Sequence, residues 1–181
     1  MTLAATGRGL CGAWFEGQRH YPSTVGWVLG DSAFFESART QLAAYFAGKR
    51  VEFDIASSGP VGGEHGGDSQ GLACMVLDLS AGTAFQQAVW QALLRIPTGL
   101  SASYGGIAQQ LSNPKAVRAV GAAVGRNPVS IIVPCHRVLG ADGSLTGYAG
   151  GLDRKMALLR LEGVGHLGDD TASSPAQSQL L

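Results

Sequence analysis

The N-terminal part of the chain spaces its apolar and polar positions in patterns typical of a small α/β unit. Gly7 and Gly9 mark a turn between two strand-like apolar flanks. Residues 32–47 place aromatic and leucine side chains near helical spacing. The short apolar runs at 51–55 and 75–79 have the length and composition of strands. This order predicts a small sheet packed against one helix.

Signals for the start of a helix dominate the chain after residue 80. Thr83 and Gln86 have the spacing of a capping box, which predicts a helix over 84–95 with one apolar face. Ser103 can cap a second helix at 104–111.

A third helix is expected directly after the second one. Asn113 and Pro114 supply an N-cap and a proline at the first helical position for a helix over 114–124. Two short helices joined by a tight turn predict a helix-turn-helix, with the second as the recognition helix. Its residues are small apart from Arg118, so it has few side chains that can pair with base edges. Small residues allow close approach of the backbone to DNA, and Arg118 has the length of a wedge.

The remaining segments set the limits of the predicted domains. Residues 57–71 are polar and glycine-rich and read as a flexible insertion, and residues 141–143 carry a hairpin-turn signal. A last helix is expected over 152–162, ended by Gly163. The chain therefore divides into an N-terminal α/β domain, a C-terminal helical domain and a disordered tail, at 1–80, 81–164 and 165–181.

Composition places the chain among soluble globular proteins. It has 181 residues, of which 45% are hydrophobic and 14% charged, with no net charge. Three cysteines, an odd number, favour a reducing compartment over a disulfide framework. The N-terminus lacks the features of a signal peptide, and no apolar run approaches the roughly 20 residues that span a bilayer. We expect a cytoplasmic protein without a membrane segment.

The charges are unevenly distributed along the chain. Residues 104–160 contain seven basic and two acidic side chains. A basic segment in a neutral chain suits a polyanion held by one face. The other interpretation is that the charges are scattered by chance. On the charge distribution alone, this second interpretation is favoured.

The sequence IIVPCHRVLG at 131–140 carries the candidate chemistry. A nucleophilic cysteine needs a thiolate, and therefore a base or a positive environment, beside Cys135. Adjacent residues of an extended chain point to opposite faces, so His136 reaches the sulfur only across a turn or through a water. Glu162 is the best carboxylate to orient His136. On its position at a helix end alone, Glu162 reads more readily as a solvated residue.

Residues 85–162 resemble the catalytic domain of O6-alkylguanine-DNA alkyltransferases almost continuously. PCHRV, RAVGAA, the pair Asn127-Pro128 and GYAGG occur in the family's order and spacing. The resemblance implies an α/β (α+β) fold, with a ribonuclease-H-like N-terminal domain before a mostly helical domain that contains a helix-turn-helix. The N-terminal part matches more loosely, since such chains usually carry a further strand before the first one here. Alkyltransferase-like proteins have tryptophan in place of the cysteine, so Cys135 indicates the catalytic branch.

The resemblance also implies roles for the residues at the matching positions. Cys135 would accept the alkyl group, and His136 would act as a base through water while Glu162 holds it. Asn127 would brace the active-site turn, and Tyr104 would donate towards N3 of the leaving guanine.

Further residues would bind the base and the duplex. The Val138 carbonyl and the Ala149 amide would read the flipped base, in a pocket with Tyr148 and Gly150. Arg118 would fill the space that the base leaves in the stack. The other DNA-binding residues are expected to be Ser103, Lys115, Ala119 and Arg126.

The function implied is repair of DNA by direct reversal. The partner would be double-stranded DNA carrying alkylated guanine, bound in the minor groove by a monomer, with no cofactor. A thioether product has no carbonyl for water to attack, so each chain would act once. O4-alkylthymine as a second substrate and cooperative binding along DNA stay open.

Three other interpretations compete with this one. A non-catalytic module that binds lesions and recruits repair factors would share the fold. A cysteine hydrolase with a Cys-His-Glu site would need an oxyanion hole, for which the sequence has no separate signature. A zinc site is disfavoured, because the spacing of the available ligands fits no compact pattern, and no metal is expected at Cys11, His20, His65 and Cys74.

Overall fold

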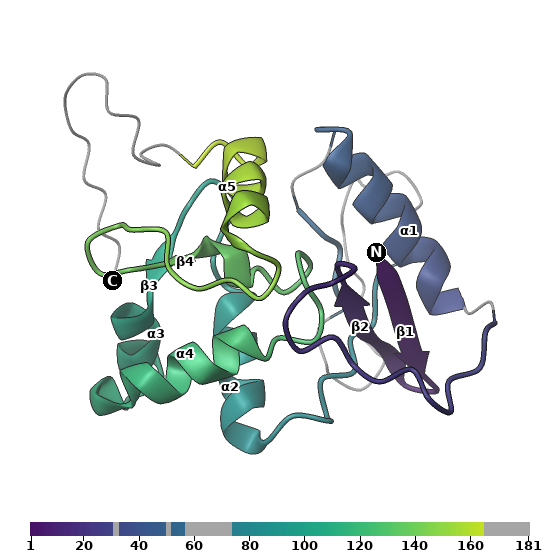
Figure 1. Ribbon diagram of the computed structural model, residues 1–181, viewed down its shortest axis with the longest axis horizontal. Coiled ribbons are helices and arrows are strands. Elements are labelled where there is room, and N and C mark those ends of the chain that lie inside the picture. The colour runs from purple at the N-terminus through teal and green to yellow at the C-terminus, as the bar shows by residue number, and fades with distance from the viewer. Residues whose placement is uncertain (31–32, 50–51, 57–73, 165–181) are drawn as a thin grey trace.

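A hairpin and one helix make up the N-terminal part of the computed structural model, which describes residues 1–30, 33–49, 52–56 and 74–164. β1 (Thr2–Thr6) pairs antiparallel with β2 (Gly9–Trp14), with an irregularity between Ala4 and Ala5. α1 (Ala33–Phe46) covers one face of the hairpin (Figure 1). The hairpin turn near Gly7 is therefore where the sequence predicts it.

Two further segments extend the hairpin, but they are not regular strands. Leu10 donates its amide to Val76 O and accepts from Asp78 N, at 2.8 and 2.9 Å. Ile55 and Met75 form the next bridge outwards. The short strands expected at 51–55 and 75–79 are therefore reduced, within the described residues 52–55 and 75–79, to single bridges. Each run bonds to its neighbour over only one or two residues.

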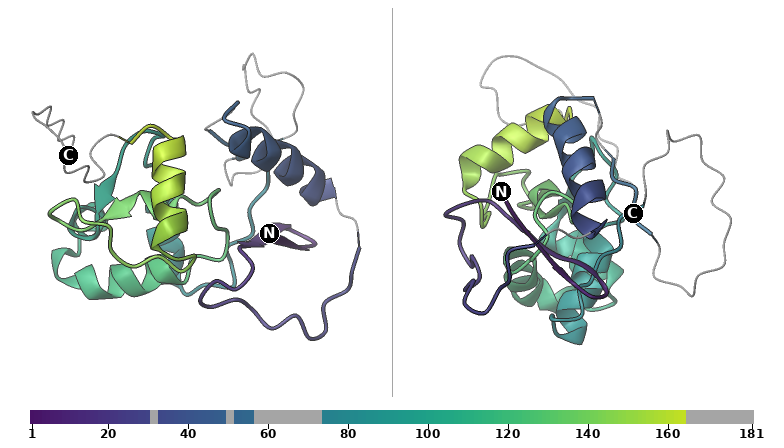
Figure 2. Two further views of the ribbon diagram at one scale, coloured as in Figure 1. Left: turned by 45° about the horizontal axis from the view of Figure 1, so that its top comes forward. Right: turned by 90° about the vertical axis from the view of Figure 1, so that its right-hand side faces the viewer.

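Helices form most of the C-terminal part. α2 (Ala84–Leu93), α3 (Tyr104–Gln110), α4 (Val117–Gly125) and α5 (Leu152–Leu161) lie together on the side of the molecule opposite the hairpin (Figures 1 and 2). Two residues of β3 (Ala102–Ser103) pair in parallel with β4 (Val138–Leu139). The Trp90 indole donates to Ala123 O at 2.9 Å and ties α2 to α4.

The helix starts follow the sequence signals with one exception. The Thr83–Gln86 capping box forms at the start of α2, and Ser103 accepts from Gly106 N at the start of α3. Asn113 makes no capping bond with its side chain. Pro114 instead opens a short 3₁₀ helix, η1 (Pro114–Ala116), and α4 begins only at Val117. The predicted third helix thus starts as a tighter turn.

The remaining predictions concern the turn at 141–143 and two segments that the structure does not describe. Gly143, in the left-handed region at φ 79°, lies in the expected turn, where Gly140 N donates to Ser144 O. β4 precedes this turn but pairs with β3, and the described residues after the turn form no strand, so it does not close a hairpin. The insertion at 57–71 and the tail at 165–181 lie outside the described residues. Within the described part of the chain, no helix is long and apolar enough to cross a membrane.

Contacts between the two parts converge on the segment before Cys135. Ala13 of β2 donates to Pro128 O at 2.9 Å and accepts from Ser130 N at 2.8 Å. From the other side, the Tyr45 hydroxyl of α1 reaches Glu162 at the end of α5, at 2.8 Å. The N-terminal part therefore supports the candidate site at two separate points.

Candidate active site

A strained, hydrogen-bonded turn places Cys135. Ile131 has a φ of 74°, which is unusual for a β-branched residue and marks local strain. The Asn127 side chain spans this turn: its Oδ1 accepts from Val129 N at 3.0 Å, and its Nδ2 donates to Val133 O at 2.7 Å. The same Nδ2 lies 3.0 Å from Cys135 Sγ. Asn127 thus fixes the turn and also points a donor at the sulfur.

Cys135 and His136 lie in a single turn of 3₁₀ helix, η2 (Cys135–Arg137). In such a turn neighbouring side chains diverge less than in a strand, so both can face the interior. Cys135 is 5% exposed and His136 is fully buried. The extended geometry that would separate the two residues is absent.

Glu162 is buried beneath His136. Its Oε1 lies 2.9 Å from His136 Nε2, and its carboxylate accepts from Arg137 Nε at 2.7 Å and from the Tyr45 hydroxyl at 2.8 Å. Burial raises the pKa of Glu162, but the hydrogen bonds from His136 and Arg137 outweigh it and hold the pKa at about 2. The alternative of a solvated glutamate is therefore wrong, and the carboxylate is ionised at neutral pH.

The ionised carboxylate fixes the tautomer of His136. Nε2 donates to Glu162, so the lone pair lies on Nδ1, which is buried and has no partner among the described residues. Burial lowers the pKa of His136 despite the opposing effect of Glu162. The ring is neutral at pH 7 and can accept a proton at Nδ1. Among the described residues, no direct hydrogen bond joins Nδ1 to Cys135.

The thiol requires such a base. Burial raises the pKa of Cys135 to about 11, although the Asn127 donor and the nearby Lys155 act against it. Lys155 is itself buried, and its Nζ donates to Val138 O at 2.5 Å and to Thr146 O at 2.6 Å. At neutral pH Cys135 is a protonated thiol, and its anion would be stabilised by Asn127, by Lys155 and by the backbone amides of Cys135 and His136.

Two of the four residues expected to bind the base, Tyr148 and Ala149, line a cavity of about 550 Å³, whereas Val138 and Gly150 do not. It lies between α4 and the segment at 147–151, and its lining includes Tyr104, Tyr148 and Ala149. The Tyr104 hydroxyl donates to Gly147 O at 3.4 Å. Val138 is fully buried, outside this lining, and its carbonyl already accepts from Lys155. Gly150 is buried, with the Tyr148 ring against it.

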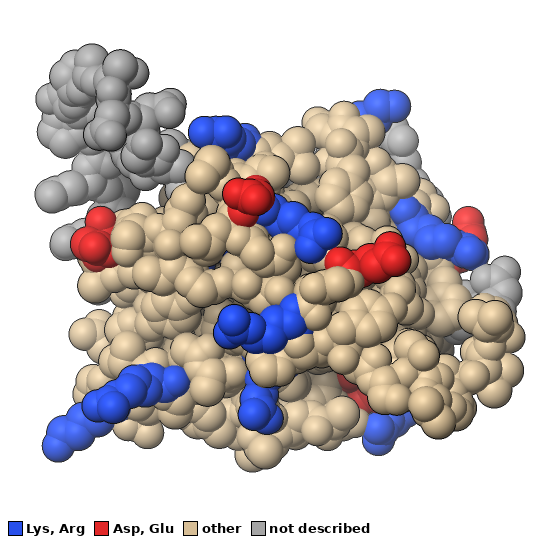
Figure 3. All heavy atoms as spheres, viewed as in Figure 1, with Lys and Arg blue, Asp and Glu red and all other residues tan. Residues whose placement is uncertain are grey.

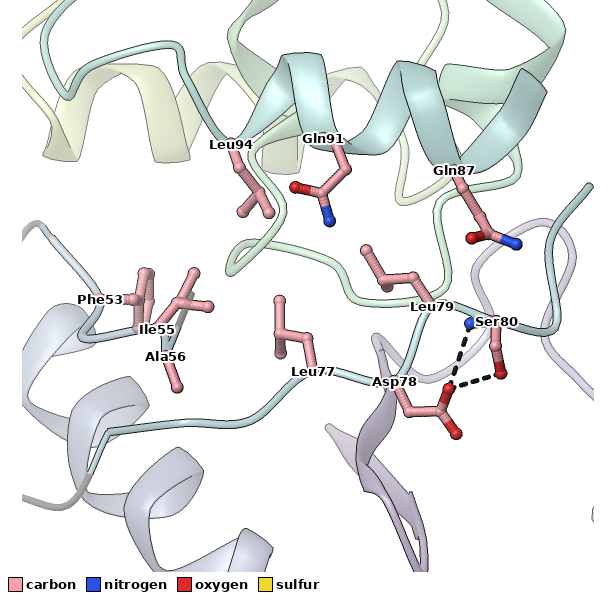
Figure 4. Close-up of a pocket in the computed structure, with 10 residues that line it drawn as sticks. All are labelled: Phe53, Ile55, Ala56, Leu77, Asp78, Leu79, Ser80, Gln87, Gln91 and Leu94. Carbon is pink, nitrogen blue, oxygen red and sulfur yellow. Dashed lines mark hydrogen bonds between the residues drawn. The ribbon is translucent and has the colours of Figure 1, made fainter. Parts of the chain in front are cut away.

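A second cavity of about 480 Å³ lies elsewhere. Gln87 and Gln91 of α2, and Leu94 directly after it, point into this cavity, across from Ile55 and Leu77 (Figure 4). It contains none of the site residues predicted from the sequence.

Of the residues expected to contact DNA, Arg118 and Ala119 lie in α4, Lys115 lies in η1 and Arg126 directly follows α4. Lys115, Arg118, Ala119 and Arg126 are all exposed, whereas Ser103 is half-buried and caps α3. The sequence has no acidic residue between Asp78 and Asp142. The region over α3 and α4, at the lower left of Figure 3, accordingly shows basic but no acidic side chains.

Three residues of the site were missed by sequence reasoning. Arg137 donates to both oxygens of Glu162 and to Ile96 O, and Lys155 and Tyr45 are described above. Arg137 adjoins the Cys-His pair, so its position was a usable signal. Tyr45 and Lys155 lie in ordinary helical patterns, and only the tertiary structure brings them to the site.

Together, the fold and this site define a class of protein: a two-part α/β chain with a buried, hydrogen-bonded cysteine beside a basic helical face. Comparisons with known proteins specify the class further. Residues 84–164 match the model of the 6-O-methylguanine DNA methyltransferase DNA binding domain, and residues 1–57 match the model of its ribonuclease-like domain.

Individual relatives agree with these matches. A methylated-DNA–protein-cysteine methyltransferase of Mycobacterium leprae is 49% identical over 162 residues, which cover 90% of this chain and 85% of the relative. One from Methanosarcina acetivorans is 48% identical over 76% of this chain and 74% of its own. The crystal structure of Mycobacterium tuberculosis OGT in complex with DNA superposes with a TM-score of 0.70 at 46% identity, covering 89% of this chain and 84% of that one.

The chain therefore belongs to the 6-O-methylguanine DNA methyltransferase family. It is a DNA-binding repair enzyme of the methylated-DNA–protein-cysteine methyltransferase type.

Proposed function

We propose that the chain repairs O6-alkylguanine in duplex DNA by irreversible transfer of the alkyl group to Cys135, once per chain. The observation that carries this proposal is the buried contact between Cys135 and Asn127. It lies beside His136, whose Nε2 is bonded to Glu162 and whose Nδ1 can take a proton. The thioether that forms on Cys135 has no carbonyl for water to attack, so the thiol is not regenerated.

The reaction balances with the groups of the chain and the substrate. His136 Nδ1 takes the thiol proton through a water, and the thiolate attacks the alkyl carbon, forming a C–S bond as the bond to O6 breaks. The bonding electrons go to the guanine ring, which ends as neutral guanine after taking up one proton. Tyr104, on the wall of the 550 Å³ cavity, turns its hydroxyl from Gly147 O to N3 and stabilises the leaving ring.

Access to the lesion requires extrusion of the nucleotide. A base inside the stack cannot reach a thiol that is 5% exposed, so the base must flip out at a cost of a few kcal/mol. The exposed face of α4 carries small residues that allow entry into the minor groove, and Arg118 fills the vacated stack. Lys115 and Arg126 contact phosphates on either side.

A count of turnovers tests the proposal. One mole of chain, mixed with excess duplex carrying O6-methylguanine, should restore one mole of guanine and then stop. The variant Cys135→Ser should bind the same duplex with similar affinity and restore none. Continued turnover would refute single use, and restoration by Cys135→Ser would refute the role of the thiol. Binding without restoration by the wild-type chain would favour a recruitment module.

A further inference from the structure

The segment that forms one wall of the 550 Å³ cavity has little regular structure of its own. Residues 140–151 connect β4 to α5 through turns. Tyr148 and Ala149, the proposed pocket wall and base-reading amide, lie in this connection. An irregular loop keeps its position only through bonds to its surroundings.

Two neighbouring carbonyls of this loop are bonded from outside it. Ala149 O accepts from Arg19 N at 2.8 Å, and Gly150 O accepts from Arg154 Nη1 at 3.0 Å. Arg154 lies in the first turn of α5, and its other arm donates to Glu16 O at 3.4 Å. One guanidinium thus joins the loop to the N-terminal part of the chain, as the planar fork of arginine allows.

An aromatic ring completes this junction. The Arg154 guanidinium lies 5.0 Å from the centroid of the Phe15 ring, within the range of a cation–π contact. A Cβ added at Gly150 would lie 2.6 Å from Tyr148 Cε1 and 3.3 Å from Phe15 Cδ2. The Tyr148 and Phe15 rings therefore pack closely against the backbone at Gly150, and the 147–151 loop has little space to shift.

The N-terminal side of the junction is itself fixed. Gln18 is buried, and its Oε1 accepts from Phe15 N at 2.8 Å and from the Ser130 hydroxyl at 3.2 Å. Ser130 belongs to the run that leads to Cys135. The Phe15–Gln18 turn is thus held to the same backbone that places the nucleophile.

We propose that Arg154 is a positioning residue for the alkylated base: it locks the 147–151 loop against the Phe15–Gln18 turn and so keeps the wall on which the base binds in place. This inference rests on the proposed function, because the base is taken to bind against this loop. Arg154 touches neither the sulfur nor the alkyl group, so its loss should weaken binding of the base and leave the chemistry unchanged.

The test uses the full chain and free O6-benzylguanine, which needs no DNA. The rate of benzyl transfer to Cys135 is followed against ligand concentration, and labelling of Cys135 by iodoacetamide reports the thiol alone. Arg154→Gln should raise the half-saturating concentration about ten-fold, as expected for one or two lost hydrogen bonds. Its limiting rate and its iodoacetamide labelling should stay within about two-fold of wild type.

Matched variants sharpen the result. Arg160→Gln, an exposed arginine of the same helix, should change nothing. Arg154→Lys keeps the charge but reaches only one carbonyl, so its half-saturating concentration should fall between those of wild type and Arg154→Gln. Phe15→Leu should mimic Arg154→Gln, and the double variant should be no weaker than either single one, because both act through one junction.

Three outcomes would overturn the inference. An unchanged half-saturating concentration in Arg154→Gln would show that the loop holds without the arginine. A parallel change in iodoacetamide labelling would indicate general destabilisation, and a loss confined to duplex substrate would indicate a phosphate contact. A wild-type chain that takes no benzyl group and restores no guanine in duplex carrying O6-methylguanine would instead overturn the proposed function, and this inference with it.

Discussion

The Glu162→Gln variant separates the role of the carboxylate in stability from its role in catalysis. Glu162 lies in the interior with its charge paired to Arg137 and hydrogen-bonded to His136 and Tyr45. Its pKa of about 2, against an ordinary value of 4.5, corresponds to about 3 kcal/mol of stability at neutral pH. Removal of one partner of a buried ion pair costs about 3–5 kcal/mol. The stability derived from the pKa thus agrees with the cost expected for breaking a buried ion pair.

The variant should therefore unfold roughly 10 °C below wild type at pH 7. Because the pKa is lower in the folded state, this contribution is present above about pH 4.5 and is lost as the pH falls towards 2. In urea unfolding, the difference in the free energy of unfolding between wild type and Glu162→Gln should shrink by about half from pH 7 to pH 3. If the difference in the free energy of unfolding does not change with pH, the charge of Glu162 is not the source of the added stability.

The same change should slow alkyl transfer. The amide still accepts from His136 Nε2, but it no longer stabilises the imidazolium that forms when Nδ1 takes the proton. We expect a loss of about 10- to 100-fold in the rate of transfer from duplex at saturating DNA, with DNA affinity unchanged. Rapid-quench assays at a temperature where both proteins are folded give this rate. Weakened DNA binding with an unchanged rate would refute the assignment.

Three further predictions concern the wedge, the brace and the thiol. Arg118→Ala should lower transfer from duplex by about ten-fold or more but leave transfer from free O6-benzylguanine unchanged, with Arg95→Ala as the surface control; equal losses on both substrates would contradict the wedge role. Asn127→Ala should destabilise the chain by about 2 kcal/mol in urea unfolding and slow transfer, because the Ile131 turn loses its bonds and the sulfur its donor; full stability would contradict the bracing role. Iodoacetamide labelling of Cys135 should speed up steadily from pH 7 to pH 10, because its pKa is raised to about 11; a plateau near pH 8 would contradict a buried, protonated thiol.

Local signals predicted the helices of the C-terminal part well. The Thr83–Gln86 box and the Ser103 cap are interactions within a few residues, so the sequence alone contains them. The expected strands at 51–55 and 75–79 depend on partners far along the chain, and there only isolated bridges form. Asn113 had the right residue type for a cap but lies in a 3₁₀ turn, which a propensity for capping does not distinguish.

The candidate site was predictable in its motif and not in its electrostatics. Cys135, His136 and Asn127 lie in one continuous stretch, and the structure brings them together. Glu162 reads as solvated in the sequence, because its burial depends on Arg137 and on Tyr45 from the distant α1. Segments far apart in the chain meet around the Glu162 carboxylate, and only the tertiary structure shows this.

Peptide mass spectrometry after reaction with methylated DNA tests the central claim most directly. The chain also contains Cys11, which is half-buried, and Cys74, which is exposed, so the position of the adduct is informative. We predict one methyl group per chain, located on Cys135 and absent from the other two cysteines. An unmodified Cys135 alongside repaired DNA, or a methyl group on Cys74 instead, would contradict it.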